Sequence, residues 1–297
     1  MLLGILQVSS GDGSWYFYQR TNVGSPVGTF ANANHFATLL LVTVPVLAAL
    51  MVSQWRSPRD TQRRSFNLAL ASAAAAVLAI GILQSGSAAV LLIGPPVVAA
   101  TLLMALRLGP RRLRQGLVAV GALVLIASAV VAVLGEKFPG WGTNASVATR
   151  AEFWANSMTI ARDHALTGTG FGTFQQAYRS YEDPAISDRW FLNHAHNDYV
   201  EIAVEGGIPA LLLLGLFLIW WFARAWDAWL ATRNSIEEKA AAVASAAILL
   251  HSAFDYPLRT AAIAAVMAMC VALMAGARGT VAQAQGRDEK PVRHATL

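Results

Sequence analysis

Charge and cysteine are both scarce in this sequence. Only 13% of its 297 residues are Asp, Glu, Lys or Arg, whereas 56% are hydrophobic, and a soluble domain is roughly one-quarter charged. This composition excludes an ordinary soluble domain. The chain has one cysteine, Cys270, so an intramolecular disulfide is excluded as well. The short alternating segments typical of a membrane β-barrel are also absent.

Long apolar runs take the place of charge. Seven runs have about the length that a helix needs to cross a hydrocarbon core about 30 Å thick. Because an unpaired backbone amide in lipid costs several kcal/mol, each run must satisfy its own hydrogen bonds as a helix. The predicted spans are 35–52, 66–83, 87–106, 116–135, 205–223, 239–254 and 260–276. The predicted fold class is therefore all-α, a polytopic integral membrane bundle of about seven transmembrane helices.

Basic residues predict how this bundle is oriented. Arginines and lysines cluster in three short connections, at 56–64, 107–114 and 224–239. Since short loops rich in Lys and Arg face the cytoplasm, seven spans that start from an outside N-terminus place the segment 136–197 outside. The formal charge of +5 is explained by this topology, so no nucleic-acid partner is expected.

The topology divides the chain into five predicted segments. They are a periplasmic N-terminal segment at 1–34, four spans within 35–135, a long periplasmic loop at 136–197, three spans within 198–276, and a disordered cytoplasmic tail at 277–297. A connection of this length in a protein otherwise made of spans is usually functional. We therefore expect the active site in or beside the loop 136–197.

Polar motifs cluster at the predicted outer face. They are Gly28-Thr-Phe-Ala-Asn-Ala-Asn-His35, Arg150-Ala-Glu-Phe-Trp154, Thr167-Gly-Thr-Gly-Phe-Gly-Thr-Phe174, His194-Ala-His-Asn-Asp-Tyr199 and His251-Ser-Ala-Phe-Asp-Tyr-Pro257. In this order and between spans, they resemble the O-antigen ligase and Wzy-type polymerase family over nearly the whole chain. The resemblance implies a metal-independent, cofactor-free glycosyl transfer at the outer face of the bacterial inner (plasma) membrane. It also implies an undecaprenyl-diphosphate-linked glycan as donor, and lipid A-core or a growing polysaccharide as acceptor.

The resemblance assigns roles to individual residues. His196, followed by Asn197 and, after nine intervening residues, by Gly207, matches the family's His-Asn motif and is the expected catalytic base. An imidazole with an ordinary pKa near 6.5 suits that task. Arg150 matches a loop arginine, and its guanidinium can hold two phosphate oxygens of the donor. Other expected substrate contacts are Asn34, His194, Asn197, Glu201 and His251.

Plainer interpretations of these residues stay open. Arg150 can pair with Glu152 at the surface. His196 can cap the helix that follows it. His251 and Asp255 are four residues apart and can hydrogen-bond each other.

A zinc site is a further alternative. His194, His196 and Asp198 have the spacing of a metallo-β-lactamase site. That fold needs another histidine where this chain has Tyr199, and it needs an α/β scaffold that membrane helices do not supply. We therefore expect no metal.

Two features depart from the family. Its members usually have more than ten spans, and this chain begins roughly where their middle would be, so we expect their N-terminal spans to be missing. The turn Gln84-Ser-Gly-Ser87 also lacks an arginine that many relatives carry. Candidates to replace it are Arg20, Arg162, Arg189 and Arg259. The alternative function is therefore a non-catalytic or truncated membrane partner in surface polysaccharide assembly or transport.

Overall fold

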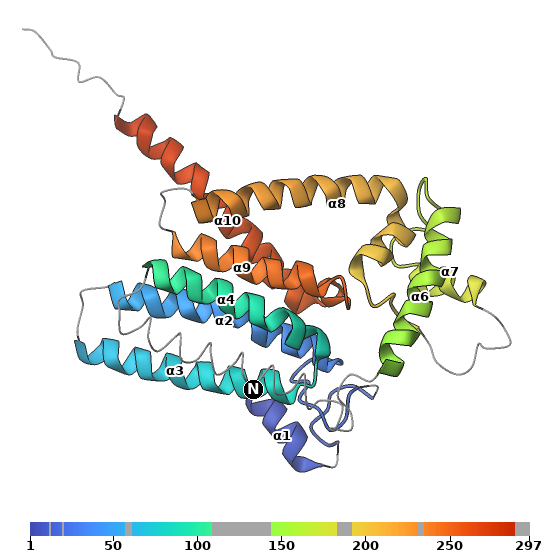
Figure 1. The fold of residues 1–297 in the computed structure, drawn as a ribbon, viewed down its shortest axis with the longest axis horizontal. Coiled ribbons are helices and arrows are strands. Elements are labelled where there is room, and N and C mark those ends of the chain that lie inside the picture. The colour runs from blue at the N-terminus through green and yellow to red at the C-terminus, as the bar shows by residue number, and fades with distance from the viewer. Residues whose placement is uncertain are drawn as a thin grey trace, which may run out of the picture.

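The computed structural model describes residues 1–11, 13–19, 21–56, 61–108, 144–182, 192–230 and 235–288. These residues form helices joined by turns, with no strand among them. In chain order the helices are α1 (Leu2–Ser10), α2 (Ala33–Arg56), α3 (Thr61–Gln84), α4 (Ala88–Leu108), α6 (Asn144–Asp163), α7 (Phe174–Tyr181), α8 (Asp198–Leu230), α9 (Ile236–His251), the 3-10 turn η2 (Pro257–Arg259) and α10 (Ala261–Asp288) (Figure 1). The predicted all-α class is confirmed for this part of the chain.

Among the residues that the structure describes, four helices are long and apolar enough to cross a membrane, namely α2, α3, α4 and α8. They overlap the predicted spans that begin at residues 35, 66, 87 and 205. The predicted span 116–135 lies outside the described residues, as do residues 136–143 and 183–191 of the predicted loop 136–197. The number of seven spans, the segment boundaries and the sidedness of the loops stay predictions.

Helix α9 packs against α2, α4 and α10 and is enclosed by them (Figure 1). Its packing surface is built from small residues, which let helix backbones approach closely. Ala240, Ala241, Ala242, Ala244 and Ala247 are each 3% exposed or less. With 16 residues, α9 is as long as the predicted span 239–254, but it begins and ends three residues earlier. It ends at His251 because the backbone after it turns, and the carbonyl oxygens of Ser252 and Asp255 accept from Asp198 N at the start of α8.

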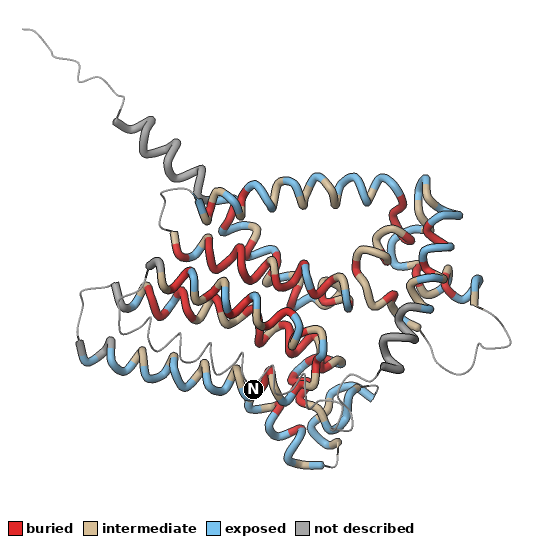
Figure 2. The backbone as a smooth tube through the Cα atoms, in the orientation of Figure 1, coloured by how far each residue is buried: buried red, intermediate tan, exposed pale blue. Residues whose placement is uncertain are grey.

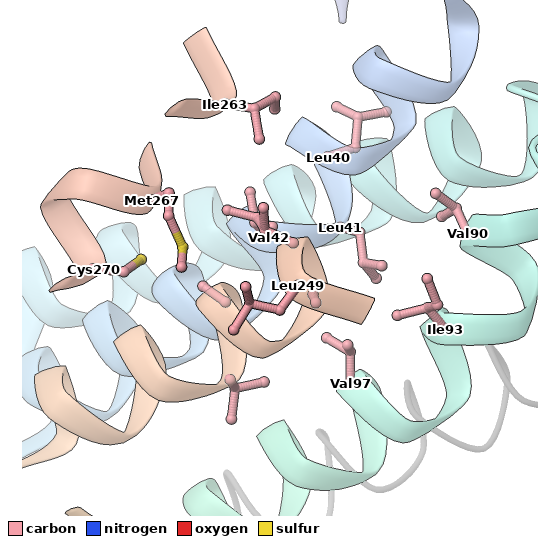
Figure 3. Packing of buried hydrophobic residues seen from close by; sticks show 14 of the residues in the cluster. Leu40, Leu41, Val42, Val90, Ile93, Val97, Leu249, Ile263, Met267 and Cys270 are labelled. Atoms are coloured by element: carbon pink, nitrogen blue, oxygen red, sulfur yellow. The ribbon is translucent and has the colours of Figure 1, made fainter. Parts of the chain in front are cut away.

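The apolar core joins α2, α4, α9 and α10 (Figure 3). Leu41, Ile93 and Ile263 all belong to this core, and so does Cys270, which lies beside Met267 in Figure 3 and is 1% exposed. Lipid tails are as apolar as these side chains, so close fit and dispersion hold the helices together more than transfer out of water does.

Helix α8 differs from α9 in that most of its length is exposed (Figure 2). It is broken at Gly207, whose φ of 57° and ψ of −154° are not helical. Before the break, α8 packs against α6 and α7 through a separate apolar cluster that includes Ile160, Phe174 and Val204. The lobe formed by α6, α7 and the first residues of α8 lies at the end of the bundle where α2 begins and α9 ends (Figure 1).

Candidate active site

Polar side chains gather where α2 begins, α8 begins and α9 ends. Those exposed by 2% or less are His35, Thr38, Asp198, Glu201, Glu205, His251, Ser252 and Asp255. Burying ionisable groups costs several kcal/mol each unless they are paired or hydrogen-bonded. A cluster of this kind beside membrane helices is typical of a functional site.

His196 and Asp255 form the first histidine–carboxylate pair in the cluster. His196 Nδ1 lies 3.1 Å from Asp255 Oδ1, and Asn34 Nδ2 donates to Asp255 Oδ2 at 2.6 Å. Burial raises the pKa of Asp255, but the hydrogen bond from His196 and the charges of His196, His35 and His251 outweigh burial and hold it well below its ordinary value. An ionised Asp255 keeps the proton on His196 Nδ1 and leaves Nε2 as the hydrogen-bond acceptor.

The backbone of His196 is strained. Its φ of 51° lies in the left-handed region, which costs a non-glycine residue roughly 1–2 kcal/mol. Hydrogen bonds of the two flanking residues keep the His196 backbone in this conformation. Trp154 Nε1 donates to Ala195 O at 2.9 Å, and Asn197 Nδ2 donates to Ala253 O at 3.0 Å. Such strain clusters at active sites. The His196 side chain is 26% exposed, so a substrate can reach it.

His194 and Glu201 form the second pair, which includes an arginine. His194 Nδ1 lies 2.9 Å from Glu201 Oε1. Arg259 Nε lies 3.4 Å from that same oxygen, and Arg259 Nη2 donates to Glu205 Oε2 at 2.8 Å. Glu201 thus shares its charge between an imidazole and a guanidinium. Asp255 has no Lys or Arg within 4.0 Å among the described residues.

Tyr256 stands between the two pairs. Its ring centroid lies 4.3 Å from that of His194, 5.0 Å from that of His196 and 4.7 Å from that of His35. The contacts with His196 and His35 are edge-to-face, a favourable geometry for aromatic rings. One aromatic side chain therefore limits how all three imidazoles can turn.

Asn197 begins α8 as its N-cap. Its Oδ1 accepts hydrogen bonds from Tyr199 N at 3.0 Å and Val200 N at 3.1 Å. A side-chain oxygen in this position satisfies amides that the helix leaves unpaired. The capping role that the sequence left open for His196 is thus filled by Asn197.

His251 sits deeper in the bundle. Its Nδ1 lies 2.5 Å from Thr38 Oγ1, and the residue is 1% exposed. The sequence left open a hydrogen bond between His251 and Asp255. The carboxylate of Asp255 is instead bonded by Asn34 and His196, and His251 contributes to it through charge.

The glycine-rich turn at 167–174 is attached to the break in α8. Glu205 Oε1 accepts from Gly172 N at 2.9 Å and from Phe174 N at 3.2 Å. Gly168 has a φ of 71°, and a Cβ atom there would lie 2.2 Å from Glu205 O. The close approach to the backbone of α8 explains why the turn needs glycine at this position. Glu205 thus connects this turn to Arg259 and the site.

A family model described as O-antigen ligase matches residues 68–215, about half of the chain. The match contains His194, His196, Asn197 and Glu201 together with α6 and the glycine-rich turn. The chain belongs to the O-antigen ligase family. No curated protein and no solved structure matches it.

Six of the seven site residues predicted from the sequence meet in the cluster of this O-antigen ligase family member. They are Asn34, His194, His196, Asn197, Glu201 and His251. The seventh, Arg150, belongs to α6, but its side chain lies outside the described residues. Their roles in catalysis and substrate binding stay predictions.

Two important residues of the candidate site were not assigned to it from the sequence. Asp255 was considered only as a partner of His251, and Arg259 only as one of four substitutes for a missing arginine. Both lie beyond the matched range 68–215, and their partners are more than 50 residues away in the chain. The one available signal was that ionisable residues beside a predicted span are rarely without a function.

The zinc-like spacing in this member of the O-antigen ligase family does not bring the three side chains together as ligands. His194 faces Glu201, His196 faces Asp255, and Asp198 Oδ2 accepts from Ser252 Oγ at 2.8 Å. Among the residues that the structure describes, no group of His, Cys, Asp and Glu could hold a metal ion. The three side chains bond three separate partners, which is unlike a shared metal site.

Proposed function

We propose that this chain transfers a glycan from an undecaprenyl-diphosphate carrier to a hydroxyl of lipid A-core or of a growing polysaccharide, at the periplasmic face of the inner membrane. The observation that carries the proposal is the His196–Asp255 pair inside an O-antigen ligase family member. A strained, partly exposed histidine on a buried carboxylate is the arrangement expected of a general base.

The proposed chemistry uses protein side chains alone. The acceptor oxygen forms a bond to the anomeric carbon while the bond from that carbon to the diphosphate breaks. His196 Nε2 takes the proton of the hydroxyl, and the diphosphate leaves with the bonding electron pair. Asp255 stabilises the imidazolium that results, as a carboxylate does in other histidine-based sites.

The two pairs differ in how well they support this proton transfer. The imidazolium of His196 would face an ionised carboxylate that, among the described side chains, has no Lys or Arg within 4.0 Å. The imidazolium of His194 would face Glu201, whose charge is already partly balanced by Arg259 at 3.4 Å. Since an opposite charge favours the protonated imidazole, the His196 pair is the better base.

Diphosphate binding is assigned to Arg150 because of its place on α6. Trp154 anchors that helix to Ala195 O, directly beside His196. Arg150 is four residues earlier on the same helix, which is about one turn or 6 Å. A guanidinium is suited to this task because it binds phosphate oxygens in a bidentate geometry.

The proposal is tested by complementing cells that lack the gene with single-residue variants. His196→Gln and Arg150→Ala should abolish high-molecular-weight surface glycan at normal protein levels in the membrane. His164→Gln is the matched control, because His164 is an exposed histidine of the same lobe outside the cluster. It should retain the full glycan ladder.

Two outcomes would contradict an enzymatic role. Normal ladders in both variants would remove His196 and Arg150 from the chemistry. If the ladder then disappeared only on deletion of the whole chain, the protein would be a non-catalytic partner in polysaccharide assembly.

A further inference from the structure

The turn between α6 and α7 exposes two large apolar side chains. Leu166 is 79% exposed and Phe171 is 73% exposed. The segment 164–178 around them contains no Asp, Glu, Lys or Arg. Neither side chain is needed to pack this lobe, whose core is formed by other residues such as Ile160 and Phe174.

The turn is nevertheless held rigidly against the break in α8. Thr169 N donates to Val204 O and Gly170 N donates to Glu205 O, both at 2.9 Å. Ile208 N donates to Ala165 O at 2.8 Å, so the turn also receives a bond from beyond the break. The two exposed side chains are therefore displayed from a fixed backbone at the level of residues 204–208.

Residues 204–208 lie at the edge of the hydrocarbon core of the bilayer. The stretch 206–223 of α8 carries no formal charge and lies between Glu205 and Arg224. Its 18 residues (223 − 206 + 1) cover about 27 Å as a helix. A hydrocarbon core is about 30 Å thick, so the two charged residues must lie at its two edges. The break and the turn attached to it then lie at the edge nearer the candidate active site.

Exposed apolar side chains also follow the break in α8. Ile208 is 46% exposed, Leu212 is 64% exposed and Leu213 is 69% exposed. Phe171 lies beside the break, because its ring carbon Cζ is 3.1 Å from the position that a Cβ atom on Gly206 would take. A soluble surface seldom exposes so many large apolar side chains together, whereas a membrane-facing surface requires them.

We propose that the turn 165–173 inserts Leu166 and Phe171 into the acyl chains of the leaflet beside the candidate active site. The occupant of this surface is the hydrocarbon of the bilayer. Insertion fixes the depth of the α6–α7 lobe, so that Glu205, Glu201 and the two histidine pairs lie just outside the hydrocarbon. The inference depends on the membrane orientation of α8 and not on the proposed glycosyl transfer.

Site-directed fluorescence in proteoliposomes tests the proposal. In a Cys270→Ala background, which removes the single native cysteine, Leu166→Cys and Phe171→Cys are each labelled with an environment-sensitive fluorophore. Ser180→Cys, an exposed position on α7, is the matched control. The two sites give independent readouts should one variant fail to fold.

Insertion predicts blue-shifted emission at 166 and 171 relative to 180. Nitroxide lipids labelled near the top of the acyl chain should quench these two positions strongly, and aqueous iodide should quench them weakly. Position 180 should show the reverse pattern. Iodide quenching at 166 and 171 equal to that at 180 would overturn the proposal. Protection from both quenchers would overturn it as well, because protein would then cover the surface.

Discussion

The two histidine–carboxylate pairs share a motif but have different surroundings. His194 and His196 are separated by one residue, each presents Nδ1 to a buried carboxylate, and each packs against Tyr256. Glu201 is also paired with Arg259, whereas Asp255 is bonded by the uncharged amide of Asn34. Two histidines that are neighbours in the chain thus receive unequal electrostatic support.

We infer from this difference that the His196 pair takes part in proton transfer and that the His194 pair positions other groups of the site. A carboxylate without a guanidinium can stabilise a newly formed imidazolium, which a general base requires. A carboxylate shared with arginine instead belongs to a network that extends through Glu205 to the glycine-rich turn. We therefore expect substitutions in the first pair to affect turnover, and those in the second to affect stability or substrate affinity.

Asp255→Asn should give the largest of these effects. The asparagine can still accept from His196 through Oδ1, and Asn34 can turn its amide to match. Loss of a charged hydrogen bond of about 1.5–3 kcal/mol predicts a roughly 10- to 150-fold fall in kcat. The depressed pKa of Asp255 keeps it ionised from pH 6 to pH 8, so its own titration should add no pH dependence to the loss.

The measurement is kcat in proteoliposomes with a lipid-linked oligosaccharide donor. Glu201→Gln is the matched carboxylate control, with a smaller fall expected. A greater kcat loss in Glu201→Gln would reverse the roles assigned to the two pairs.

Arg259→Gln should mainly lower stability. It leaves the carboxylates of Asp198, Glu201 and Glu205 buried together without a cation. Because Arg259 is itself 26% exposed, we expect a loss of about 1–2 kcal/mol in the free energy of unfolding. Thermal unfolding in detergent measures it, with Arg162→Gln on the exposed end of α6 as the control. Equal midpoints for the two variants would mean that the network contributes nothing measurable.

His194→Gln should have the smallest effect. A glutamine side chain can still donate a hydrogen bond to Glu201, but it cannot take up or release a proton as an imidazole does. If His194 only positions substrate, KM should rise by less than about tenfold, equivalent to 1.4 kcal/mol, while kcat stays near that of the wild type. Initial rates over a range of donor concentrations separate the two constants. A collapse in kcat with unchanged KM would show that His194 carries out the chemistry.

The sequence predicted part of this picture for physical reasons. Hydropathy placed α2, α3, α4 and α8, because a span in lipid must be long and apolar. It placed α9 three residues too far along the chain, since hydropathy does not register the cap that Ser235 provides at the start of the helix. The motif residues His194, His196 and Asn197 were recognised locally, because they are adjacent in the chain.

The partners of these histidines could not be predicted in the same way. Asp255 reaches His196 across 59 residues, and it reaches Asn34 across 221. These contacts depend on how α2, α8 and α9 pack together, which a pattern of apolar residues does not specify. The left-handed backbone of His196 likewise follows from bonds to Trp154 and Ala253 on either side of it.

The central claim is that Asp255 acts through His196, and a double-mutant cycle measures this most directly. Initial rates are compared for the wild type, His196→Gln, Asp255→Asn and the double variant under identical reconstitution. Residues that act as one unit are not additive, so Asp255→Asn should cost nothing further once His196 is replaced. If the two losses multiply instead, Asp255 acts independently of His196, and the proposed base is not supported by its carboxylate.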